Sequence, residues 1–238
     1  MVRLQLCHIE FREVIMRILL LVLCLASVAC STKPIVTSND ASAAGYPQLV
    51  VVEDVPFDGF YVISANVFSN YEAIYFEPLN VDNVVIDESR LNARDKPWKL
   101  TDSDKVRLRE YFDERVRQVF GESEIFTLQT ESAGQQLRVA VELLEFTPSA
   151  AKDDFKSRDP GVKIYTRSVG DLIMRATITD AGTGDLLAVV EDKRRVGDSS
   201  RLERNDRVRN TRQVKRTFST WLSRLQTMMM QLRAVPTE

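Results

Sequence analysis

Alternating apolar and polar residues, set between two amphipathic stretches, constrain the fold of this chain more than any other feature. The alternation runs through Leu137–Phe146 and again through Leu172–Ile178, where a turn rich in Gly and Asp leads into the apolar run Leu186–Val190. A period of two predicts half-buried antiparallel strands, and the turn predicts a hairpin. These segments are therefore the expected centre of a sheet.

The amphipathic stretches predict two helices. The first spans Asp102–Phe120, with Thr101 as N-cap, Asp104 three residues on and Gly121 at its end. The second spans Arg207–Leu232. The side chains expected in the core are Leu108, Tyr111, Phe112, Val116 and Val119 on the first helix, and Val214, Phe218, Trp221, Leu222, Leu225, Met228, Met229 and Leu232 on the second.

Short β-rich runs complete the expected sheet, and they are Leu49–Val52, Phe60–Ile63, Glu72–Phe76, Val81–Ile86 and Ile125–Leu128. This order predicts an α+β fold: a two-layer sandwich with an antiparallel sheet and two main helices packed on one face. Residues 49–238 are enough to bury one substantial core, so we expect a single domain there.

The segment Met16–Cys30 has the three parts of a bacterial secretion signal: Arg17, an apolar run from Ile18 to Leu25, and small residues before a cysteine. We therefore expect export, with residues 1–29 as the signal peptide. The apolar run is shorter than the roughly 20 residues that span a bilayer, which argues against a transmembrane anchor. Because Glu10 and Glu13 place negative charge ahead of it, we expect translation to start at Met16.

The end of this segment, Ser27-Val28-Ala29-Cys30, resembles the lipobox of bacterial lipoproteins, although Ser27 stands where that family prefers Leu. The resemblance implies cleavage before Cys30, acylation of Cys30 and anchoring to a membrane through its acyl chains. Ser31 after the cysteine implies the outer membrane, with the domain facing the periplasm. Cleavage after Ala29 by the ordinary signal peptidase is the alternative. Residues 30–48, rich in Ser, Ala and Thr, are expected to form the lipidated cysteine and a flexible tether.

Removal of the signal removes Cys7, Cys24 and His8, the single histidine of the chain. The exported part then has neither imidazole nor a free thiol. Its composition excludes Ser-His-Asp triads, cysteine nucleophiles, histidine zinc sites and haem ligation. We therefore expect no cofactor and no metal.

Positive charge concentrates toward the C-terminus, with 12 Lys or Arg against 4 Asp or Glu from Lys193 onward and 20 against 30 before it. Within this basic run, Arg209, Arg212 and Arg216 fall on the side of the second helix opposite its apolar stripe. They form a candidate surface for an anionic partner: lipid headgroups, a cell-wall polymer or an acidic envelope protein. A solvated surface is the alternative, and an exported protein is not expected to meet nucleic acid.

The residues Val169–Asp180, continuing through Thr183–Ala188, resemble a family of Gram-negative lipoproteins known as domain of unknown function 3313. Tyr71–Val81, the helix opened by Leu100-Thr101 and the closing helix with Trp221 are similar to it as well. The resemblance implies an envelope lipoprotein, and it brings no established activity or site residues. At the level of fold it is similar to small auxiliary lipoproteins of envelope transport systems.

Four further motifs have structural explanations. Ser149 and Lys152 match the S-x-x-K pattern of penicillin-binding enzymes, but the companion motifs S-D-N and K-T-G are absent from the sequence. The glycines of Gly182-Thr183-Gly184 suit a hairpin turn rather than a phosphate loop. Asp102 and Asp104 suit the first turn of a helix rather than a calcium site. Carboxylates near one strand end are either solvated or a hydrolase pair, namely Glu142, Glu145, Asp153 and Asp154.

We therefore expect a non-enzymatic accessory or interaction module of the cell envelope. One alternative is a carboxylate-dependent hydrolase of cell wall or glycan. Another is a lipid-binding carrier, which an apolar cavity of about 300 Å³ or more between sheet and helices would favour and a packed core would not.

Overall fold

The computed structural model describes residues 34–152, 161 and 163–234, and the residues from Pro34 on form one compact unit. Two long helices are α2 (Asp102–Phe120) and α3 (Arg207–Arg233), with 3-10 turns η1 (Ser42–Ala44) and η2 (Ala93–Asp95). The strands are β1 (Ile35–Ala41), β2 (Tyr46–Glu53), β3 (Gly59–Val62), β4 (Ala73–Phe76), β5 (Val85–Ile86), β6 (Thr127–Gln129), β7 (Leu137–Pro148), β8 (Tyr165–Thr166), β9 (Gly170–Asp180), β10 (Leu186–Val196) and β11 (Glu203–Arg204).

Nine strands form one sheet in the order β1-β2-β3-β10-β9-β7-β4-β6, with β5 also paired to β7. Its centre is the β9–β10 hairpin, to which β7 adds antiparallel along its whole length. The expected antiparallel sheet is therefore confirmed for most of the sheet. It is wrong at one edge, where β4 and β5 run parallel to β7 and β4 runs parallel to β6. The physical reason is that the chain returns to this edge through α2, and parallel neighbours require such a crossover.

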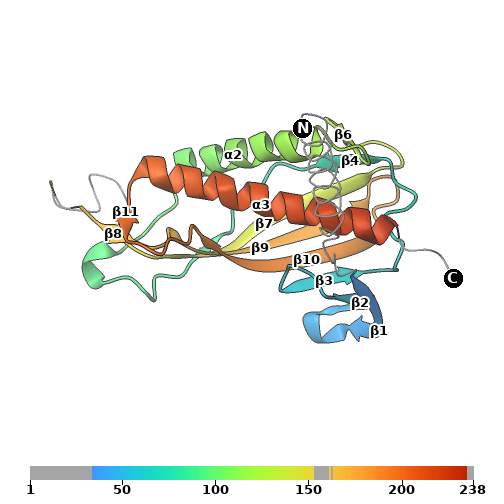
Figure 1. Cartoon of the computed structure of the whole chain (residues 1–238), viewed down its shortest axis with the longest axis horizontal. Coiled ribbons are helices and arrows are strands. Elements are labelled where there is room, and N and C mark those ends of the chain that lie inside the picture. Colours follow the sequence, from blue (N-terminus) through green and yellow to red (C-terminus); the bar gives the residue numbers. More distant parts are fainter. Residues whose placement is uncertain (1–33, 153–160, 162, 235–238) are drawn as a thin grey trace, which may run out of the picture. The chain divides into compact units, whose positions relative to one another are not determined.

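The alternation predicted for the central strands is confirmed. In β7, Leu137, Val139, Val141 and Leu143 are buried and the residues between them are partly exposed. Met174, Ala176 and Ile178 of β9 are buried in the same way. These side chains share one apolar cluster with buried residues of α2 and α3, and Figure 1 shows both helices on the same side of the sheet.

Helix α2 begins and ends where the sequence predicts. The Thr101 hydroxyl accepts a hydrogen bond from the Asp104 amide, and the Asp104 carboxylate accepts one from the Thr101 amide at 3.0 Å, which completes a capping box. Phe112 and Val116 are buried in the core, and the other predicted face residues pack against it: Leu108, Tyr111 and Val119.

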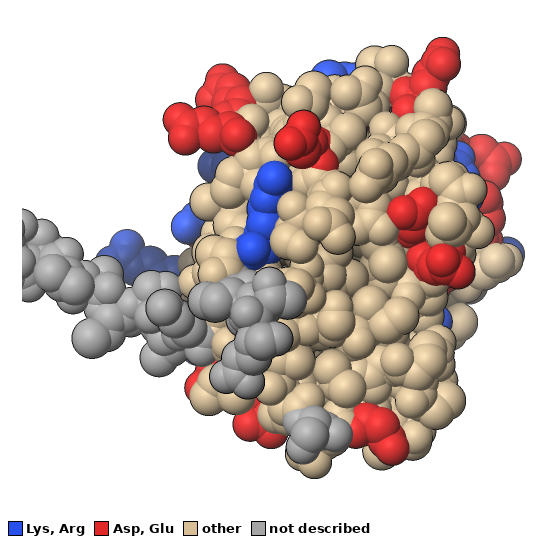
Figure 2. Space-filling model, turned by 90° about the vertical axis from the view of Figure 1, so that its right-hand side faces the viewer, with Lys and Arg blue, Asp and Glu red and all other residues tan. Residues whose placement is uncertain are grey.

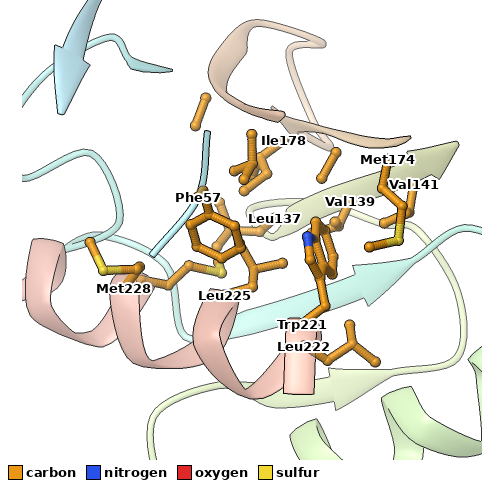
Figure 3. Close-up of a cluster of buried hydrophobic side chains, with 14 of the residues drawn as sticks. Phe57, Leu137, Val139, Val141, Met174, Ile178, Trp221, Leu222, Leu225 and Met228 are labelled. Atoms are coloured by element: carbon orange, nitrogen blue, oxygen red, sulfur yellow. The ribbon is translucent and has the colours of Figure 1, made fainter. Parts of the chain in front are cut away.

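Helix α3 buries the predicted stripe. Phe218, Trp221, Leu222 and Leu225 are buried, and Met228 and Met229 fill the core below them. Figure 3 shows the Trp221 indole among Val139, Val141 and Met174 of the sheet. An edge contact joins it to Phe57, with ring centroids 5.9 Å apart. Helix α3 is therefore the main element that covers the core on this face of the sheet.

The flexible tether expected over residues 30–48 is wrong from Ile35 on, because β1 and the start of β2 occupy that stretch. Val36 pairs with Val52, so the hairpin extends the sheet by two strands. All side chains of the two buried clusters lie between Ala41 and Leu232. The unit 34–238 thus contains a complete core, the property that lets a domain fold by itself.

Within the part of the chain described, no helix is both long enough and apolar enough to cross a bilayer. Met1–Lys33, including Cys30 and the predicted signal, lie outside the described residues.

Candidate functional site

A cavity of about 390 Å³ lies between the N-terminal halves of α2 and α3 and the sheet beneath them. Leu143 of β7, Leu172 of β9 and Val196 of β10 form its floor. Its remaining apolar lining comes from both helices, from β5 and β7, and from the segments before β5, α2 and β9: Val84, Ile86, Trp98, Leu100, Leu108, Tyr111, Phe146, Val169, Val214 and Phe218. The volume lies within the range of small-molecule sites, and a cavity of about 150 Å³ already holds benzene.

The helix geometry explains why this space is not filled. In the C-terminal half of α3, Trp221 and two methionines reach down to the sheet. In its N-terminal half, the shorter Thr211 and Val214 line the cavity. Side chains of this size fill less space than Trp221 and the methionines do, so the dense packing of the C-terminal half is not continued here.

Polar groups surround one end of the cavity. Thr101, Ser103 and Arg207 line it and are exposed to solvent, so the cavity opens at the first turns of both helices. Lys152 also lines it and pairs with Asp104, while its Nζ donates to the Lys99 carbonyl at 2.7 Å and lies 5.4 Å from the Trp98 ring centroid. Burial alone would raise the pKa of Asp104, but hydrogen bonds from Lys152 and Thr101 outweigh it and hold that pKa below its ordinary value.

One hydrogen-bond acceptor at this end has no partner among the described residues. Asn210 donates from Nδ2 to Asn205 Oδ1 at 2.8 Å, and Asn205 donates to the Ala151 carbonyl at 3.1 Å. This chain of amides fixes which way Asn210 points and leaves its Oδ1 buried and unsatisfied. Asn210 lines the cavity with its other atoms, because Oδ1 itself has no exposed surface.

The S-x-x-K pair is used structurally. The Ser149 hydroxyl lies 2.8 Å from that of Ser168, while Lys152 makes the contacts at the cavity. The Gly182-Thr183-Gly184 segment joins β9 to β10 as predicted, and Gly184 has a φ of 81°.

Of the carboxylates proposed as a hydrolase pair, the two that the structure describes, Glu142 and Glu145, do not line the cavity. Glu142 pairs with Arg175 at 3.4 Å, and Glu145 accepts a hydrogen bond from Thr147 at 3.3 Å. Asp153 and Asp154 lie outside the described residues. Asp104 is the single acidic residue in the lining, and the described residues contain no cluster of three or more His, Cys, Asp or Glu.

The predicted arginine surface is wrong in one of its three members. Arg212 and Arg216 are exposed, but Arg209 is only 7% exposed. Its guanidinium donates to Glu203 Oε2 at 2.6 Å, to Thr166 Oγ1 at 3.1 Å and to the Arg167 carbonyl at 3.1 Å. The short strands β8 and β11, which the alternation of residues did not reveal, cover this side of α3. Arg209 is therefore a structural residue and is unavailable to a partner.

These features define an α+β protein with a large, mostly antiparallel sheet, two helices and an apolar cavity beneath their first turns. The chain belongs to the family described as protein of unknown function (DUF3313), whose model matches residues 43–225. The predicted family is thereby confirmed. No curated protein matches the chain at a significant level.

Three solved structures share a distant likeness. A Xanthomonas campestris protein of the DUF330 family has 10% sequence identity and a TM-score of 0.40, with 68% of this chain and 86% of that chain covered. The PelC dodecamer from Paraburkholderia phytofirmans has 7% identity and a TM-score of 0.32, with 71% and 91% covered. A putative neuraminyllactose-binding hemagglutinin homolog from Helicobacter pylori has 9% identity and a TM-score of 0.31, with 69% and 92% covered. Likenesses this distant carry no inference about function.

Proposed function

We propose that this protein is a non-enzymatic binding protein of the cell envelope, held at the outer membrane by an acylated Cys30, with its folded unit in the periplasm. Its cavity between α2, α3 and the sheet binds an apolar small molecule. The cavity carries the proposal, because its volume of about 390 Å³ exceeds the roughly 300 Å³ at which small-molecule pockets begin. The lipobox resemblance of Ser27–Cys30 supports the anchor.

The chemistry of the lining supports binding rather than catalysis. Glycoside hydrolysis by carboxylates needs two of them across the scissile bond. Among the described residues of the lining, Asp104 is the one acid, and it is held in the helix cap and by Lys152. Most of the lining residues are apolar, so an apolar ligand fits best. The shared core of sheet and helices supports the two-layer arrangement on which this cavity depends.

The experiment uses the unit 34–238 and the neutral apolar dye N-phenyl-1-naphthylamine, which fluoresces on entering an apolar site. We expect saturable binding at one site, with energy transfer from Trp98 in the lining. Val214→Phe places a larger side chain in the cavity and should weaken binding at least about tenfold, which corresponds to 1.4 kcal/mol.

Val106→Phe is the matched control, because Val106 is half exposed on α2 and does not line the cavity. Its binding should equal that of the wild type. Absence of saturable binding, or equal losses in both variants, would contradict the proposed binding site. If the cavity binds the dye as expected, mass spectrometry of lipids that copurify with the full chain would identify the ligand carried in cells.

A further inference from the structure

A small two-stranded sheet beside the first turn of α3 separates its side chains into two faces. In this sheet Tyr165 of β8 lies opposite Arg204 of β11, and Thr166 lies opposite Glu203. Residues directly opposite in antiparallel strands share a face, so Tyr165 and Arg204 belong to one face and Thr166 and Glu203 to the other. Thr166 is buried, whereas Tyr165 and Arg204 are exposed.

Arg209 of α3 fixes the buried face. It is bonded to both of that face's side chains, Thr166 and Glu203, and to the Arg167 carbonyl. The backbone is held as well, because the Asn205 amide donates to the Ile164 carbonyl at 2.7 Å. The opposite face is thus directed outward by contacts that involve none of its own side chains.

The outward face combines cations with exposed apolar groups. Tyr165 is 52% exposed and Leu202 64%, and Val208 in the first turn of α3 is 71% exposed. The exposed cations around them are Lys163, Arg167, Arg201, Arg204 and Arg207. We call Lys163, Tyr165, Arg167, Leu202 and Arg204 the basic ribbon.

Acidic groups offset little of this charge. Glu203 is engaged by Arg209, and Asp206 caps α3 by accepting from the Arg209 amide. Asp206 also lies 4.0 Å from Arg204, and Asp198 is exposed nearby in sequence. Among the described residues of this region, the exposed cations therefore outnumber the acidic groups that are not held by Arg209 or the helix cap.

The charge is localised to one end of the unit. Figure 1 shows β8 and β11 together at the start of α3, and Figure 2 shows that uncharged residues cover most of the opposite end, with Asp and Glu around it and some Lys or Arg among them. Arg207, three residues after Arg204, lines the cavity. The basic ribbon therefore lies next to the opening of the cavity.

We propose that the basic ribbon docks the unit on an anionic lipid bilayer. Arg and Lys attract anionic headgroups, while Tyr165 and Leu202 of the ribbon, together with Val208 in the first turn of α3, enter the headgroup region, which is the combination that interfacial protein surfaces use. A cell-wall polymer would pair with the cations but would give Leu202 and Val208 no apolar phase. Docking requires no ligand in the cavity and so stands apart from the proposed function.

The test is sedimentation of the unit 34–238, which lacks Cys30, with vesicles of phosphatidylcholine alone or mixed with phosphatidylglycerol. We expect binding to the anionic vesicles only, and weaker binding as salt rises. Arg167→Gln/Arg204→Gln should weaken binding about 30-fold, because each cation near an anionic surface contributes about a factor of five. Leu202→Ser should weaken it several-fold further.

Arg212→Gln/Arg216→Gln is the matched control, since it removes the same charge from exposed positions farther along α3. It should bind nearly as the wild type does. Equal losses of vesicle binding in the two double variants would overturn the proposal, because they would show that the total positive charge of the unit, and not the basic ribbon, attracts the bilayer. No binding to anionic vesicles, or sedimentation with peptidoglycan instead, would overturn it as well. Circular dichroism of each variant shows that the fold is retained.

Discussion

Trp221 offers the sharpest test of how the core is held together. It is 1% exposed and lies in the main cluster against Phe57 and the central strands. Replacement of a buried Trp by Ala costs about 3 to 5 kcal/mol, because apolar contacts are lost and a cavity remains. For a unit of this size each kcal/mol corresponds to about 2 to 4 °C. Trp221→Ala should therefore lower the midpoint of thermal unfolding by roughly 6 to 20 °C.

The indole nitrogen makes a second substitution informative. Trp221 Nε1 is buried and has no hydrogen-bond partner among the described residues. A buried donor without a partner costs about 1 to 3 kcal/mol. Trp221→Phe removes that donor and keeps one ring in the cluster, so the two effects oppose each other. We expect its free energy of unfolding to lie within about 1.5 kcal/mol of the wild type, far above that of Trp221→Ala.

The assay is urea unfolding of the unit 34–238, followed by circular dichroism because the substitutions remove a fluorophore. Equal slopes with denaturant would show that both variants unfold from similarly compact states. If Trp221→Phe proves as unstable as Trp221→Ala, the indole nitrogen has a partner and the reasoning is wrong. If Trp221→Ala unfolds within a degree of the wild type, α3 does not cover the sheet.

Two other predictions concern a buried acid and the anchor. Burial raises the pKa of Asp192 to about 6, against the pull of Arg194. An acid with a raised pKa stabilises the fold below its unfolded pKa and loses that contribution as pH rises through the folded pKa. The unfolding free energy of Asp192→Asn relative to wild type should thus increase by about 2 kcal/mol from pH 4 to pH 8, and parallel pH profiles would contradict this. Cys30→Ala in the full chain should abolish acylation and release the processed protein from the membrane fraction, since each buried methylene contributes about 0.8 kcal/mol. Unacylated wild-type Cys30 would refute that prediction.

The parts of the fold that local sequence determines were predictable. The α2 boundaries follow from the cap at Thr101 and from Gly121, and the core face of α3 follows from its spacing. The β9–β10 hairpin follows from its turn. Each of these features depends on residues that are close in sequence, within a few helical turns or within one hairpin, so its backbone hydrogen bonds are local.

Contacts between distant segments were not predictable. Arg209 lies nine residues before Phe218, which is two and a half helical turns and hence the opposite side of α3. Helical spacing alone therefore assigned it to solvent. Its burial depends on β8 and β11, each of only two residues, too short for a readable alternation. The sequence could not predict the cavity, and it entered only as the condition under which a lipid carrier would be favoured. Its volume depends on the distance between two helices and a sheet.

The early start of β1 has a consequence for how an anchored protein would move. Only Ser31–Lys33 separate Cys30 from Pro34, and a fully extended chain over that distance reaches about 14 Å. An acylated Cys30 would thus be a short tether that keeps β1 and β2 close to the bilayer. Docking of the basic ribbon on the same bilayer would add a second fixed point. With two points held, the unit would lose most of its rotational freedom and present the opening of its cavity to the lipid at nearly constant height.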